Sequence, residues 1–153
     1  MTCPICGCKM PNKSMCIYCK ITGDQVEGAS NKKAKEHIKA KDRKDVYYST
    51  TMPKDVNRTH LMLLTILLGF FGAGNYYVGK YAKGAYCTAS WIVFLPFVIS
   101  NSVFGGGLYA IKLLSEITAV LVMFNLLMWI ADIFSLIAKT YKVPVVLGEK
   151  KKK

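Results

Sequence analysis

Charged residues are scarce in one long stretch of this 153-residue chain, although its net charge is +12 at pH 7. Residues 59–138 contain only three of the 21 Lys and Arg residues and two of the nine Asp and Glu residues. The other 18 basic residues lie in residues 9–58 and 139–153. A soluble domain interleaves charged and apolar positions along each helix. The separation seen here is typical of a membrane protein with basic flanks.

The sequence also lacks the motifs that mark common catalytic sites. Its two histidines, His37 and His60, are isolated, and there is no HExxH, no GxSxG and no Walker loop. The two acids of the apolar block, Glu116 and Asp132, are sixteen residues apart, which is about 24 Å along a continuous helix. That separation is too large for joint acid–base catalysis. We therefore expect no enzymatic activity.

A cleavable signal peptide is not expected, because the chain opens with cysteines and polar residues rather than a basic start and an apolar run. The first apolar helix would then act as its own insertion signal, and the N-terminal segment would stay in a reducing compartment. Five of the six cysteines fall within the first nineteen residues. A reducing compartment disfavours a disulfide framework for them.

These cysteines form two CxxC pairs, Cys3 with Cys6 and Cys16 with Cys19. A CxxC turn places two thiolates close enough to share one ion, and two such turns complete a tetrahedral S₄ site for structural Zn²⁺. Cys8 is a fifth thiol, and its replacement of Cys6 as a ligand stays open. The alternative, a redox dithiol, is disfavoured because it needs one CxxC at a helix start within a βαβ pattern.

Three apolar segments make up the membrane block, at residues 59–78, 85–104 and 108–138. A helix of about 20 residues spans the hydrocarbon core, so we expect the first segment to cross the membrane. Basic flanks at both ends favour an even number of crossings, whereas three segments give an odd number. We favour three long helices and leave the number of membrane crossings open. Either the Pro96 segment is re-entrant or lies in the interface, or all three segments cross and the Lys-rich tail lies outside.

The expected fold class is an all-α membrane protein. It is a hairpin or bundle of two to three apolar helices, with a small N-terminal zinc ribbon and a basic juxtamembrane helix. Five segments are expected: a zinc ribbon (1–22), a linker (23–31), a basic juxtamembrane helix or linker (32–58), a membrane domain (59–138) and a basic tail (139–153).

Asp132 is an acid within an apolar helix, where a charge is costly. It should therefore face a partner, a polar cavity or the interface, and Trp129 one turn earlier suits an aromatic belt. If Asp132, Asn125 and Glu116 lined a polar path, the chain would be a component of a small transporter or channel.

Gly, aromatic and Lys residues recur between Gly69 and Gly84. A W-x-x-D sequence, Trp129 to Asp132, follows near the end of the third apolar segment. This series of residues resembles the TM-2 (two-transmembrane) domain family, whose motif is similar to LGxFGxHRFYxGKxxxG. Gly74–Asn75 replaces the His-Arg pair of that family, and residues 91–107 resemble an insertion. The resemblance implies a bacterial membrane protein, often joined to a zinc ribbon, with no established reaction. The matching membrane-motif positions include Gly69, Gly72, Tyr76, Tyr77, Gly79, Lys80, Gly84, Trp129 and Asp132.

The leading hypothesis is a non-enzymatic, membrane-anchored zinc-ribbon module for interaction or scaffolding. We expect it in the plasma (inner) membrane as a multi-pass protein, with the ribbon cytoplasmic. Its basic flanks would attract anionic lipid headgroups. A protein partner, or self-association through small residues such as Gly69 and Gly72, is also expected. The alternatives are the transporter component that uses Asp132 and a membrane-tethered nucleic-acid binder, which the basic segment suits less well because it lacks interleaved aromatics.

Overall fold

The computed structural model describes residues 2–10, 15–40, 44–104 and 109–148. It divides into two compact units. The terminal unit combines Met1–Leu61 with Ala138–Lys153, and the helical unit is Met62–Ile137. Segments predicted separately as ribbon, linker, juxtamembrane helix and tail thus belong to one unit.

The terminal unit is built around a two-stranded sheet and two short helices, α1 (Gly23–Glu27) and α2 (Asn31–Lys39). Strand β1 (Val46–Ser49) pairs antiparallel with β2 (Val143–Val146). The register places Val46 opposite Val146 and Ser49 opposite Val143. Two segments about one hundred residues apart in the sequence therefore form one sheet. The sequence-based prediction of an all-α fold did not include this sheet.

Burial explains why β2 forms in a tail that reads as basic. The side chains of Val143 and Val145 are fully buried. The Asn31 side-chain amide donates a 2.8 Å hydrogen bond to the Pro144 carbonyl. The Asp55 carboxylate accepts hydrogen bonds from the N–H groups of Asn31 (3.2 Å) and Lys32 (2.6 Å), which fixes the start of α2. The start of α2 is thus joined both to Asp55 and to the C-terminal strand.

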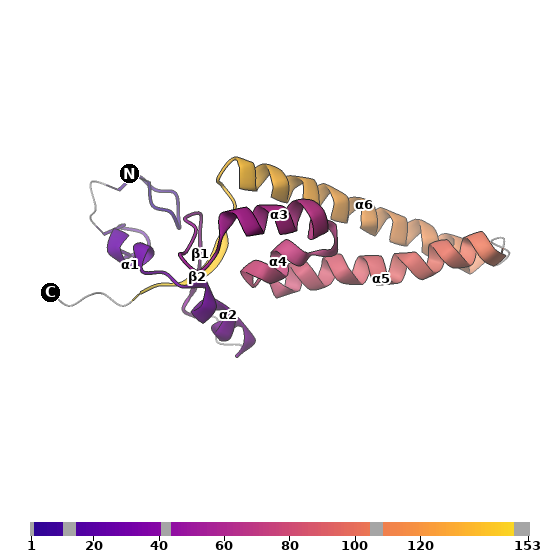
Figure 1. Ribbon diagram of the computed structural model, residues 1–153, viewed down its shortest axis with the longest axis horizontal. Helices are drawn as coiled ribbons and strands as arrows, with labels where there is room; N and C mark the ends of the chain where they lie inside the picture. Colours follow the sequence, from indigo (N-terminus) through magenta and orange to yellow (C-terminus); the bar gives the residue numbers. More distant parts are fainter. Residues whose placement is uncertain (1, 11–14, 41–43, 105–108, 149–153) are drawn as a thin grey trace. The chain divides into compact units, whose positions relative to one another are not determined.

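The helical unit contains two long helices that run side by side in opposite directions (Figure 1). They are α5 (Tyr81–Phe104) and α6 (Tyr109–Ile137), about 36 and 43 Å long at 1.5 Å per residue. Both are long and apolar enough to cross a membrane, over Tyr81–Ile99 and Leu114–Ile137. Pro96 lies inside α5 without ending it.

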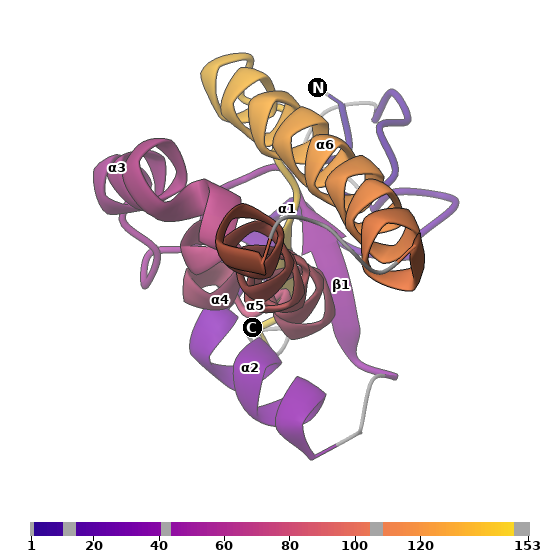
Figure 2. The same ribbon diagram turned by 90° about the vertical axis from the view of Figure 1, so that its right-hand side faces the viewer.

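The first apolar segment differs from the expected spanning helix. It breaks into α3 (Arg58–Leu68), which begins just before the unit boundary, the 3₁₀ turn η1 (Gly69–Phe71) and α4 (Ala73–Val78). Gly72 has φ of +88°, a left-handed conformation that glycine adopts without strain and that interrupts a helix. Helix α4 and the turn η1 fold back beside the N-terminal half of α5 (Figures 1 and 2). The described structure therefore has two long helices rather than three.

Candidate functional sites

The four predicted zinc ligands lie on two turns of the same design. In the first turn, the Gly7 N–H donates to the Cys3 carbonyl (2.8 Å). In the second, the Lys20 N–H donates to the Cys16 carbonyl (2.7 Å). Gly7 and Lys20 both have positive φ, at +77° and +53°, which closes each turn after its second cysteine.

The two turns bring four sulfur atoms into one cluster. The Sγ atoms of Cys3, Cys6, Cys16 and Cys19 all lie within 4.8 Å of one another. Tetrahedral Zn–S bonds of about 2.3 Å would separate the sulfurs by about 3.8 Å, so the spacing fits a metal ion. Cys8 lies outside this group.

All six cysteines, each within the described part of the chain, are free. Cys6 Sγ and Cys16 Sγ are 3.4 Å apart, far beyond the roughly 2.05 Å of a disulfide bond. A set of four thiols without a disulfide could bind a soft or borderline metal.

A metal binds the thiolate form of cysteine, and local hydrogen bonding favours this form at Cys16. The backbone N–H of Cys19 donates toward the Cys16 sulfur and lowers the pKa of Cys16 to about 7. Burial instead raises the pKa of Cys19. Ionising all four thiols together would place like charges in contact, so a cation is the natural means of holding them as thiolates.

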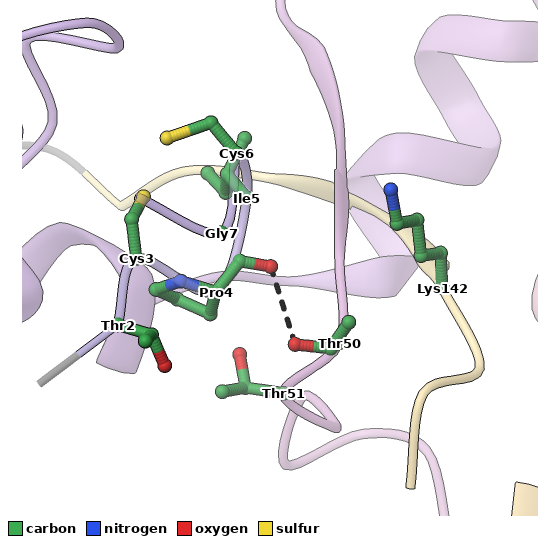
Figure 3. A pocket seen from close by; sticks show the side chains of 9 residues that line it. All are labelled: Thr2, Cys3, Pro4, Ile5, Cys6, Gly7, Thr50, Thr51 and Lys142. Carbon is green, nitrogen blue, oxygen red and sulfur yellow. Dashed lines mark hydrogen bonds between the residues drawn. The ribbon is translucent and has the colours of Figure 1, made fainter. Parts of the chain in front are cut away.

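The first cysteine turn is joined to the sheet. Both the backbone N–H and the hydroxyl of Thr50 donate to the Pro4 carbonyl, at 3.0 and 3.3 Å. A cavity of about 400 Å³ lies at this junction (Figure 3). The cysteine cluster is therefore part of the terminal unit's architecture. The cavity is lined by Thr2, Cys3, Pro4, Ile5, Cys6, Gly7, Thr50, Thr51 and Lys142.

Asp132, in the helical unit, has a charged partner on the neighbouring helix. Lys83 Nζ lies 2.6 and 2.8 Å from the two carboxylate oxygens of Asp132. The two side chains retain 27% and 13% of their exposure. Lys83 is not among the residues predicted from the sequence. The sequence could have indicated this pair, because one Lys near the start of an apolar helix and one acid near the end of the next would lie close together in a helical hairpin.

The helix is interrupted between α3 and α4, at residues 69–72, and we call this interruption the break after α3. Trp129 and two other side chains donate hydrogen bonds to backbone carbonyls at or near it. The Trp129 indole N–H donates to the Thr65 carbonyl at 2.6 Å. Asn125 Nδ2 donates to the Phe70 carbonyl (3.2 Å), and the Thr88 hydroxyl donates to the Phe71 carbonyl (2.8 Å). A break in a helix leaves carbonyls without their usual partners. Side chains from α5 and α6 supply those partners here.

Asn125 also joins the two long helices. Its Nδ2 donates to the Cys87 carbonyl (3.2 Å) and to Ser90 Oγ (2.8 Å), and its side chain is fully buried. Glu116 is exposed, and Asp132 pairs with Lys83. The three residues proposed for a polar path thus have three different surroundings.

Three motif glycines lie where no side chain would fit. A Cβ on Gly69 would lie 2.6 Å from Trp129 Cδ1, and one on Gly72 would lie 2.8 Å from the Gly84 carbonyl oxygen. A Cβ on Gly84 would lie 2.9 Å from the Tyr76 ring. These positions allow the break to pack closely on α5 and α6.

The remaining motif residues lie around the same break. The Tyr76 hydroxyl is 3.2 Å from that of Thr88, and Tyr77 is partly buried on α4. Gly79, with φ of +87°, ends α4. The Lys80 N–H donates to the Asn75 carbonyl at 2.8 Å. The motif therefore describes one packed structural element.

No protein-family model, curated protein or solved structure matches the chain. The resemblance to the TM-2 domain family therefore stays a prediction from the sequence.

Proposed function

We propose that this chain is a multi-pass membrane protein that holds a zinc-stabilised, non-enzymatic interaction unit at one face of the membrane. The pairing of β1 with β2 carries the proposal. Two strands that hydrogen-bond to each other must lie on the same side of a bilayer, since an open sheet edge is not tolerated in hydrocarbon. Both ends of the chain therefore share one side.

A chain that starts and ends on one side crosses the membrane an even number of times. Helices α5 and α6 supply two crossings. Helix α3, about 16 Å long, is too short to add a third. The α3–α4 segment would instead enter and return on the same side, and the side-chain partners of its carbonyls support this because backbone at membrane depth must be satisfied by protein.

Charge supports a cytoplasmic location for the terminal unit. This unit holds 18 of the 21 basic residues and seven of the nine acidic ones. Positively charged segments next to membrane helices stay on the cytoplasmic side. We place the chain in the plasma membrane, where a reducing cytoplasm would suit the five free cysteines of the terminal unit.

Four cysteine thiolates in a tetrahedral arrangement are a common ligand set for structural zinc. Cys3, Cys6, Cys16 and Cys19 would hold it, and the ion would supply a rigid link between the two turns. Four protein ligands leave no open position for a substrate or water, which favours a structural role. A small unit held in this way offers a surface for a protein partner.

The first test compares crosslinked partners from native membranes. A Cys16→Ser, Cys19→Ser variant should lose zinc and lose protein partners that the intact chain captures. Cys8→Ser is the matched control, because Cys8 lies outside the cluster, and it should retain both. An unchanged partner set in the double variant would remove the zinc-held unit as the interaction module.

The second test maps the sides of the membrane. Reporters fused to both termini should be cytoplasmic, and a tag inserted between α5 and α6 should lie on the other side. Termini on opposite sides would contradict the proposal, because β1 and β2 could not then pair.

A further inference from the structure

The tip of the second cysteine turn is unusually apolar and exposed. Ile17 and Tyr18 each retain 80% of their exposure, and Met15 just before the turn retains 44%. No other large apolar side chain that the structure describes is as exposed as the first two; Phe134 on α6 reaches 67%. In the equivalent first turn Ile5 is partly buried against the cluster, so the exposure of Ile17 and Tyr18 is a property of the second turn.

Single exposed apolar residues are ordinary on protein surfaces. This tip differs from the adjacent pair Tyr47 and Tyr48, which retain 36% and 50% of their exposure, because both of its side chains retain 80% and a third apolar residue is close by. Tyr and Ile suit the boundary between water and hydrocarbon, where the ring hydroxyl remains hydrated while the apolar atoms are buried.

Charge favours an anionic surface as the partner of this tip. Lys20, directly after the turn, is exposed. The terminal unit as a whole carries eleven more basic than acidic residues. Basic residues beside apolar side chains are the combination that binds anionic lipid.

Chain connectivity favours the bilayer among anionic surfaces. Tyr141, buried in the terminal unit, comes four residues after Ile137, where α6 ends. Four residues reach at most about 14 Å. If α6 crosses the membrane as proposed, so short a covalent link keeps the terminal unit within reach of the lipid surface.

We propose that the second cysteine turn is a membrane-contact surface. Ile17 and Tyr18 insert into the interfacial layer of an anionic bilayer, with Met15 beside them and Lys20 at the phosphate groups. This deepens the proposed function, and it rests on the membrane attachment proposed there. A protein partner would then bind another face of the terminal unit.

The experiment places the photo-crosslinking amino acid p-benzoylphenylalanine at position 18 of the full chain, in native membranes. Illumination should give a lipid adduct detectable by mass spectrometry. Position 48 is the matched control, because Tyr48 is a half-exposed aromatic residue of β1 in the same unit. A protein or nucleic-acid adduct at position 18, no adduct, or equal lipid adducts at both positions would overturn the proposal.

A second measurement tests charge and insertion with the purified full chain. The lipid-adduct yield at position 18 should be severalfold higher in bilayers of phosphatidylcholine with phosphatidylglycerol than in phosphatidylcholine alone. Ile17→Asp should lower it at least about tenfold, since burying such a side chain is worth more than one tenfold step. Equal yields would overturn the proposal. Zinc content confirms that each variant is folded, and the terminal reporters test the membrane topology separately.

Discussion

Gly7 of the terminal unit and Gly72 of the helical unit serve different purposes. In the terminal unit, a Cβ on Gly7 would meet no atom within 4 Å, so this glycine serves only the positive φ of the cysteine turn. In the helical unit, Gly72 needs a positive φ and also lies against Gly84. One unit is held by a sheet and contains a cluster of four thiols. The other is held by close packing and by side chains bonded to backbone carbonyls.

This difference predicts that metal removal acts on one unit only. A chelator, or Cys16→Ser, should unfold the cysteine turns, because structural zinc contributes about 10–16 kcal/mol in small metal-dependent folds. Limited proteolysis should then cut within residues 1–22, while far-UV circular dichroism retains the signal of α5 and α6. Loss of the whole helical signal would show that the units do not fold separately. Cys8→Ser should behave like the intact chain.

The second prediction breaks the helical unit through its backbone. Gly72→Ala should destabilise it by about 3 kcal/mol, from a positive φ and an overpacked contact with Gly84. Unfolding in a detergent or denaturant series measures the loss. Gly23→Ala is the control, because its Cβ would meet nothing within 4 Å, and it should change stability little. Similar losses in both variants would contradict the assignment of Gly72 as a packing position.

The cysteine cluster could be predicted because its four residues are close together in the sequence. A CxxC turn carries its own geometry, and two turns within nineteen residues have little freedom to separate. The pairing of β1 with β2 could not be predicted in this way. Each strand has four residues, Val46 pairs with Val146, and Tyr47 and Tyr48 are exposed. The burial that stabilises β2 depends on Asn31 and other residues far away in the chain.

The break in the first apolar segment was missed for a related reason. The run at residues 59–78 has the composition of a spanning helix, and its glycines were interpreted as a surface for helix association. The structure uses Gly69 and Gly72 to end the helix and to approach α5 and α6. Apolar composition predicted a preference for lipid, but close packing determined the backbone path.

The third prediction concerns the ion pair of the helical unit. Asp132→Leu should cost about 2 kcal/mol, because it leaves the Lys83 ammonium without its carboxylate in a largely apolar setting. The double variant Lys83→Met, Asp132→Leu should recover part of this loss, because the Lys83 charge is removed while Lys80 still loses the attraction of Asp132. Equilibrium unfolding of both variants measures the coupling. A double variant less stable than the single one would show that the pair contributes more than mutual neutralisation.

The smallest expected effect compares two tryptophans that both contact the Phe70 ring, with centroid distances of 6.0 Å for Trp129 and 5.6 Å for Trp91. Trp129→Phe removes the hydrogen bond to the Thr65 carbonyl and should cost about 1 kcal/mol. The Trp91 indole nitrogen is buried without a hydrogen-bond partner among the described residues, so Trp91→Phe removes an unsatisfied donor and should be close to neutral. Equal losses in the unfolding series would assign the effect to ring volume. A larger loss for Trp129→Phe would show that a side chain from α6 stabilises the break after α3 by binding its backbone.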